Sequence, residues 1–204
     1  MNANHKPYVD RWLAHIQALA GEIGPRGPAT EDERRAAEYC GEVLAGLGLA
    51  PWMEAFRSAR SIFHPFLLAS VTMLIAFAIY PLAGRASAGV AAVLSLVAVL
   101  SAAMELAFRD NLLRRLMPKG RSQNTVATIS PTGEHRQDLL LVGHVDTQRT
   151  PIIFKSPRWI VAYQAFTTIA FVLWLAQIVL YFLGTVTEWG WIWPVSILSA
   201  VAAA

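Results

Sequence analysis

The stretch from Trp159 to Thr187 reads WIVAYQAFTTIAFVLWLAQIVLYFLGTVT and contains no Asp, Glu, Lys or Arg. Ser61–Gly84 and Ala86–Met104 also lack these charged residues. Each run is long enough for a helix of about 20 residues, which crosses a hydrocarbon core of ~30 Å. A fourth uncharged run, Trp189–Ala204, reaches only ~24 Å as a helix at ~1.5 Å per residue. Because 55% of the chain is apolar and 15% charged, these runs predict a helical membrane protein.

Lysine and arginine gather where the polar segments meet the apolar runs. They are Arg57, Arg60, Arg109, Arg114, Arg115, Lys119, Arg121, Lys155 and Arg158. The loops between paired apolar runs hold only Arg85 and Glu188. Because loops rich in Lys and Arg stay on the cytoplasmic side, we predict a protein of the cell (inner) membrane with cytoplasmic polar segments. Orientation and attraction to anionic lipids account for the basic bias, so we expect no nucleic-acid partner.

The alternation of polar and apolar sequence predicts four segments. Residues 1–60 are polar, 61–108 form a transmembrane hairpin, 109–158 are polar and 159–204 form a second hairpin. Each hairpin returns the chain to the side that it left, so we expect the polar segments to join into one cytoplasmic domain. The last apolar run stops with the sequence, and we expect the natural polypeptide to continue past Ala204. Residues 1–21 carry charges throughout, which is not the pattern of a signal peptide.

The first polar segment predicts two helices. Apolar residues recur at helical spacing over residues 8–19, and a loop rich in Gly and Pro follows at residues 24–28. Thr30 and Glu33 have the spacing of a capping box, which predicts the start of the second helix. Gly48 suits the C-terminal cap of that helix.

The sequence also predicts short strands and a helical extension. Trp52–Phe56 and Asn124–Ser130 are expected to be strands. Leu106–Met117 is expected to continue the second apolar helix as an amphipathic extension. Glu105 lies one turn before Arg109, so we expect an ion pair between them at the end of that helix.

A second apolar stretch, Asp138-Leu-Leu-Leu-Val-Gly-His144-Val-Asp146-Thr147, carries the candidate chemistry. Its continuous apolar run is typical of a strand buried on both faces in a parallel sheet. Ligand sites in such sheets form just beyond the carboxyl ends of the strands. A histidine at that edge can bind a metal, and an aspartate two residues later can orient the imidazole. The alternative is that His144 and Asp146 merely cap a loop.

The same residues resemble a known family. Gly24-Pro25-Arg26-Gly27-Pro28, the helix with Glu33–Tyr39 and Leu47-Gly48-Leu49 look like the opening of the dizinc aminopeptidases of metallopeptidase family twenty-eight. Asn124-Thr-Val-Ala127 followed by Leu140–Asp146 resembles that family's next strands and its first metal motif. The resemblance covers residues 1–60 and 120–150, about half of the chain.

The resemblance implies a fold and a site. The fold class would be α/β plus helical membrane, with a partial zinc-peptidase-like α/β cytoplasmic domain interrupted by two transmembrane hairpins. His144 would bind zinc, and Asp146, the candidate catalytic residue, would orient that imidazole. The family then supplies further acidic ligands, a Glu-Glu pair and a distant His. After Asp146 this sequence has one acidic residue, Glu188, and no His, so the second-metal ligands and the catalytic base are missing.

Two functions therefore remain open. The first is a membrane-anchored zinc aminopeptidase that cleaves peptide substrates, present here as an N-terminal portion inactive by itself. The second is a non-catalytic membrane subunit of a larger complex that retains a degenerate peptidase scaffold. The expected partners are the lipid bilayer, a peptide if the enzyme is complete, and other membrane subunits. The polar segments predict two helices and three strands. Two helices cannot cover both faces of the sheet that these strands would form, so we expect further sequence or a partner to cover the remaining surface.

Overall fold

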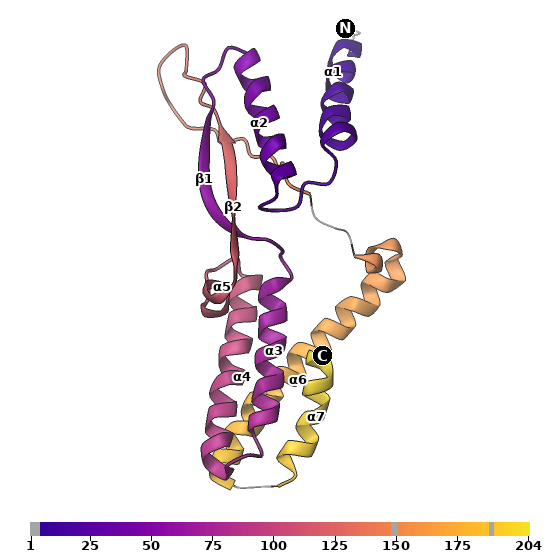
Figure 1. Ribbon diagram of the computed structural model, residues 1–204, viewed down its shortest axis with the longest axis vertical. Helices are drawn as coiled ribbons and strands as arrows, with labels where there is room; N and C mark the ends of the chain where they lie inside the picture. Colours follow the sequence, from indigo (N-terminus) through magenta and orange to yellow (C-terminus); the bar gives the residue numbers. More distant parts are fainter. Residues whose placement is uncertain (1–4, 148–150, 188–189) are drawn as a thin grey trace. The chain divides into compact units, whose positions relative to one another are not determined.

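The computed structural model describes residues 5–147, 151–187 and 190–204. The chain divides into two compact units, which we call the polar unit (Met1–Ser61 with Pro118–Arg149) and the helical unit (Ile62–Met117 with Thr150–Ala204). The described residues are mostly helical, with seven α-helices and one two-stranded sheet (Figure 1). Residues 109–117 and 150–158, grouped above with the polar segments, belong to the helical unit.

The polar unit contains three helical elements and a β-ribbon. These are α1 (Lys6–Ile16), the π-helix η1 (Gln17–Ile23), α2 (Glu31–Gly46), β1 (Trp52–Ala59) and β2 (Lys119–Val126). The strands pair antiparallel, with Trp52 opposite Val126 and Ala59 opposite Lys119. The ribbon therefore joins the two polar segments of the sequence, as the hairpin arrangement predicts.

The ends of α2 follow the sequence prediction. The Thr30 side chain accepts a hydrogen bond from the Glu33 amide at 3.3 Å, which confirms the capping contact. The Glu33 carboxylate accepts from the Ala29 amide at 2.5 Å, one residue before the usual partner in a capping box. Gly48 has a φ of 81° just after the helix, the left-handed conformation that favours glycine at this position.

Helix α2 packs against strand β2 through small and polar side chains. The Thr125 hydroxyl donates to the Ala37 carbonyl at 2.7 Å, and the Ser122 hydroxyl donates to the Glu33 carboxylate at 2.6 Å. A Cβ at Gly120 would lie 2.4 Å from the Cβ of Ala29. Glycine is therefore required where β2 passes the start of α2.

The structure corrects the strand predictions. β1 is longer than expected, whereas β2 starts at Lys119 and ends at Val126 instead of running over residues 124–130. The buried strand predicted at 138–142 is wrong, because no strand is assigned there and Leu139–Val142 are 80–85% exposed. The physical reason is that the ribbon offers only two antiparallel strands, without the parallel neighbours and covering layers that a central strand needs. The described residues therefore show no zinc-peptidase fold.

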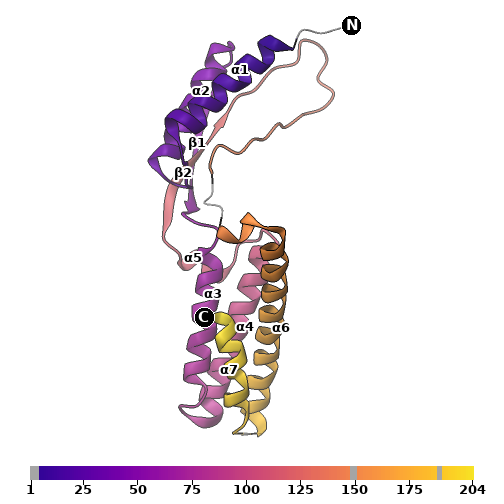
Figure 2. The same cartoon turned by 90° about the vertical axis from the view of Figure 1, so that its right-hand side faces the viewer.

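The helical unit consists of α3 (His64–Ile79), α4 (Gly84–Leu106), α5 (Leu112–Leu116), the 3-10 helix η2 (Ile152–Lys155), α6 (Pro157–Thr187) and α7 (Ile192–Ala203). Within this unit α3 packs on α4 and α7, and α6 packs on α4 and α7 (Figure 2). The four longer helices thus form a bundle, whose hairpin turns follow α3 and α6.

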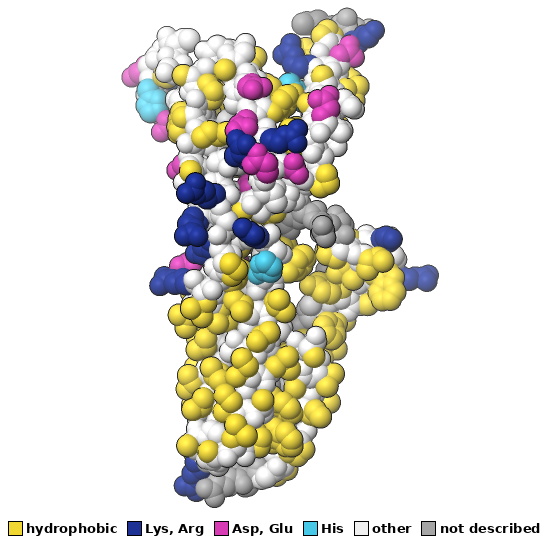
Figure 3. All heavy atoms as spheres, in the orientation of Figure 1, with side chains coloured by type: hydrophobic (Ala, Val, Ile, Leu, Met, Phe, Trp, Pro, Cys, Tyr) yellow, Lys and Arg dark blue, Asp and Glu magenta, His cyan; other side chains and the backbone are white. Residues whose placement is uncertain are grey.

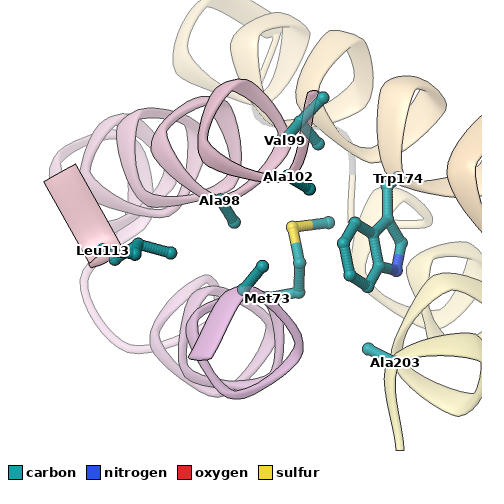
Figure 4. Close-up of a cluster of buried hydrophobic side chains, with 8 residues drawn as sticks. Met73, Ala98, Val99, Ala102, Leu113, Trp174 and Ala203 are labelled. Carbon is teal, nitrogen blue, oxygen red and sulfur yellow. The ribbon is translucent and has the colours of Figure 1, made fainter. Parts of the chain in front are cut away.

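Small residues bring the helices of this bundle close together. In Figure 4 the Met73 side chain of α3 extends toward Trp174 of α6, beside Ala98 and Ala102 of α4. A second buried cluster stacks Tyr80 on Tyr181, with ring centroids 4.4 Å apart. Polar side chains link the buried faces, because Gln177 donates to Ser95 at 3.3 Å and Tyr181 to Ser196 at 3.0 Å. Close approach of small residues with polar links is typical of helices that associate in lipid.

Large aliphatic and aromatic side chains cover the outside of the helical unit (Figure 3). Two of its helices, α4 with 23 residues and α6 with 31, are long and apolar enough to cross a membrane. The helices α3 and α7 have 16 and 12 residues, so each spans less than ~30 Å at ~1.5 Å per residue.

The chain breaks after α4, which corrects the extension predicted for residues 106–117. Phe108 has a φ of 54°, a conformation that ends the helix, and α5 starts only after Asn111. The break brings Arg114 to Glu105 at 3.1 Å, while the Asn111 amide donates to the same carboxylate at 2.9 Å. The carboxylate of Glu105 is therefore paired with Arg114, and the predicted pairing with Arg109 is wrong.

Candidate functional site

Arg26 is the residue that organises the candidate site in the polar unit. The loop at residues 24–28 begins at Gly24, whose φ of 82° allows the chain to turn sharply after η1. The Arg26 guanidinium donates to the carbonyls of Leu19 and Gly24, and its Nε donates to the Val145 carbonyl at 2.8 Å. The side chain therefore joins the loop to the segment that carries the His-x-Asp motif.

The backbone of Arg26 completes this link. Its amide donates to the Thr147 hydroxyl at 2.8 Å, and its carbonyl accepts from the Thr147 amide at 2.7 Å. Three hydrogen bonds thus hold Val145 and Thr147, which flank Asp146 on both sides. We call this set of contacts the Arg26 clamp.

The structure brings His144 and Asp146 together. Nδ1 of His144 lies 3.3 Å from Oδ1 of Asp146, and the carboxylate can only accept in this contact. Nδ1 is therefore the donor in this contact, and in the neutral imidazole the lone pair then lies on Nε2. The His144 side chain is 93% exposed and the Asp146 side chain 27%. The fixed aspartate orients an accessible imidazole, which is how carboxylates support metal-binding histidines.

The described residues do not supply a complete metal site. Among them no group of three His, Cys, Asp or Glu side chains could hold a metal ion. His15 is bonded to the Tyr39 hydroxyl at 2.7 Å, and His135 to Asp138 at 2.9 Å. Glu188, the one acidic residue after Asp146 in the sequence, lies outside the described residues. Zinc needs about four ligands, so among the described residues the imidazole of His144 alone cannot hold an ion.

Other candidate catalytic groups in the polar unit are already engaged. Glu33 is buried, and both of its carboxylate oxygens accept hydrogen bonds, so it stabilises the start of α2. Burial raises the pKa of the Cys40 thiol, an effect that the nearby positive charge of Arg26 only partly offsets. Cys40 is therefore a poor nucleophile at neutral pH, because the thiolate is the reactive form.

Surface ion pairs on α2 affect titration without forming a site. The hydrogen bond and charge of Arg34 lower the pKa of Glu31, and Glu31 in turn raises the pKa of Arg34. Arg34 also pairs with Glu38, one turn further along. These side chains are about half exposed, so we assign them to a solvated helix face.

The sequence pattern predicts a role for His144 and Asp146 but none for Arg26. The available signal was its position between two Gly-Pro pairs, Gly24-Pro25 and Gly27-Pro28, which hold the loop in one conformation. Val145 and Thr147, the partners of Arg26 in the motif segment, lie over a hundred positions away along the chain, so this link follows only from the fold. No known protein family, curated protein or solved structure matches this chain.

Proposed function

We propose that this chain is the membrane-anchored part of a zinc-aminopeptidase-like protein. In this proposal the helical unit spans the membrane, and the polar unit presents His144 as one ligand of a metal site that residues outside the described ones complete. The observation that carries the proposal is the exposed His144 imidazole, oriented by Asp146 and held by the Arg26 clamp. Peptides are the proposed substrates of the complete protein.

The membrane assignment is supported by the two long apolar helices and by the surface of the bundle. Exposed Val93 in α4 and Val172 in α6 are typical of side chains that face lipid, whereas many of the buried residues are Ala and Ser. In a bilayer each helix satisfies its own backbone hydrogen bonds, so these surfaces need no further protein cover.

The charges at the two ends of the helical unit support the orientation. One end holds a cluster of cations, and the end with the hairpin turns holds Arg85. The cations of the first end are Arg109, Arg114, Arg115, Lys155 and Arg158. The positive-inside rule places this basic end, and hence the polar unit, in the cytoplasm.

Single cysteines test the orientation in a Cys40→Ser background. Leu82, 74% exposed in the first hairpin turn, and Arg35 on the surface of α2 are suitable sites. We expect an impermeant maleimide added to intact cells to label Leu82→Cys, and to label Arg35→Cys only after the membrane is opened. Labelling of Arg35→Cys alone in intact cells would show that the polar unit lies outside the cell, opposite to the proposed orientation. Labelling of both sites would show that the helical unit does not span the membrane.

The chemical part predicts that the purified chain is inactive by itself. Among the described residues no group of three His, Cys, Asp or Glu side chains could hold a metal ion, whereas a two-metal site needs ligands for ions about 3.5–4 Å apart. We expect no hydrolysis of leucine anilide by the purified chain. Turnover that a chelator abolishes would contradict this expectation and would show that copies of the chain complete a site together.

A second function, a non-catalytic membrane subunit, is favoured by one observation. The aliphatic residues Leu139–Val142 are 80–85% exposed in a segment without helix or strand, and an isolated protein rarely leaves such a run in water. A partner chain that covers this segment would make the polar unit an assembly element without any metal. The zinc content of the native assembly separates the two functions.

A further inference from the structure

Helix α1 carries an apolar face that no other described element covers. Its large apolar residues lie on one side of the helix and are 41–62% exposed: Tyr8, Val9, Trp12, Leu13 and Ile16. Asp10, Arg11 and Ala14 lie on the other side. None of the residues of α1 is buried. The helix is therefore amphipathic, and its apolar side faces outward.

We propose that the apolar face of α1 lies in the interface of a phospholipid bilayer. The inference rests on the proposed membrane location of the chain and adds a second, peripheral contact with the membrane. A helix that lies in the interface places its apolar side ~5–10 Å into the boundary between headgroups and acyl chains. Trp12 and Tyr8 suit that depth, because an aromatic ring with one polar atom prefers the headgroup level.

The charges on α1 favour an anionic lipid surface as the occupant. Lys6 and Arg11 are cationic, and Asp10 is the acidic residue of the helix. Each Lys or Arg near an anionic leaflet adds to the attraction for the membrane surface. The His15 ring lies 2.7 Å from the Tyr39 hydroxyl of α2, and this contact links α1 to the rest of the polar unit.

The connections of the chain also favour lipid over a separate protein. The sequence passes between the polar unit and the helical unit at Ser61, Met117 and Arg149. If the helical unit spans the bilayer, these connections hold the polar unit near its surface, and the effective concentration of lipid at α1 is high. A helix can use that proximity without cost to its backbone, because its amides and carbonyls are paired within the helix.

Two labelled cysteines on opposite faces of α1 test this inference. In the Cys40→Ser protein, Trp12→Cys reports the apolar face, and the matched control Ala14→Cys reports the polar face; both positions are exposed. Each variant carries an environment-sensitive fluorophore and is placed in nanodiscs of anionic phospholipid brominated near the top of the acyl chains. Val93→Cys, 56% exposed on α4, reports insertion of the helical unit in the same discs.

The expected result is quenching at residue 12 at least about twofold stronger than at residue 14, because one face of an interfacial helix lies at the depth of the bromines. Equal quenching at residues 12 and 14, with strong quenching at 93, would overturn the inference and leave the membrane location intact. If the fluorophore at residue 12 is shielded from water but is not quenched by the brominated lipid, the apolar face of α1 contacts protein and not lipid, which would overturn the inference. If the fluorophore at residue 93 is not quenched, the helical unit is not inserted in the bilayer, and the proposed membrane location is wrong.

Discussion

Removal of the Arg26 side chain should loosen the segment that carries His144 and Asp146. In Arg26→Ala the bond from Nε to the Val145 carbonyl, at 2.8 Å, is lost, together with the two bonds to the carbonyls of Leu19 and Gly24. The backbone bonds between Arg26 and Thr147 remain possible, but the loop that positions them loses its internal support.

The magnitude follows from the one side-chain bond that crosses to the motif. A hydrogen bond of this kind contributes about 1–1.5 kcal/mol net in a partly exposed site. Because 1.4 kcal/mol corresponds to a factor of ~10 in an equilibrium constant, local opening of the segment should become roughly tenfold more frequent. The Thr147 amide donates to Arg26 at 2.7 Å, so its protection against hydrogen exchange should fall by the same factor.

The assay is hydrogen exchange of the intact chain in nanodiscs, followed at residues 145–147. Arg35→Ala is the matched control, because that arginine is exposed and pairs only at the surface with Asp32 at 3.3 Å. Such surface pairs contribute about 0–1 kcal/mol, and both members of this pair lie on α2. If Arg26→Ala and Arg35→Ala leave the Thr147 amide equally protected, the Arg26 clamp does not hold the motif.

Two further predictions concern the packing and titration of the polar unit. Gly120→Ala should destabilise the polar unit by about 1–3 kcal/mol, because the new Cβ would lie 2.4 Å from that of Ala29; thermal unfolding should show no such loss for Gly46→Ala, where nothing lies within 4 Å. Cys40 should react with iodoacetamide with a pH midpoint above that of Ala14→Cys in the Cys40→Ser protein, because burial raises the pKa of the Cys40 thiol. A midpoint at or below that of the exposed cysteine would contradict the burial of Cys40.

Features set by neighbouring residues could be predicted from the sequence. Thr30 and Gly48 marked the ends of α2 because each acts on backbone groups within a few residues. The apolar runs predicted the helices of the helical unit for the same reason, although Phe108 ended α4 earlier than its amphipathic continuation implied. His144 and Asp146 were found as a pair because they lie two residues apart.

Features set by distant residues could not be predicted. The run at 138–142 has the composition of a buried strand, but a strand also needs neighbours, and the polar unit supplies only the antiparallel pair β1 and β2. The contacts of Arg26 with Val145 and Thr147 depend on the fold in the same way, and no local pattern encodes them.

The zinc content of the protein isolated from its native membrane, with any chains that accompany it, tests the central proposal most directly. Wild type should carry zinc, His144→Ala should lose it, and Asp146→Asn should bind it about 10–100-fold more weakly, because the aspartate only orients the imidazole. Equal zinc in all three proteins would reject His144 as a ligand. Wild-type protein without zinc would contradict the peptidase-like function and favour the non-catalytic membrane subunit.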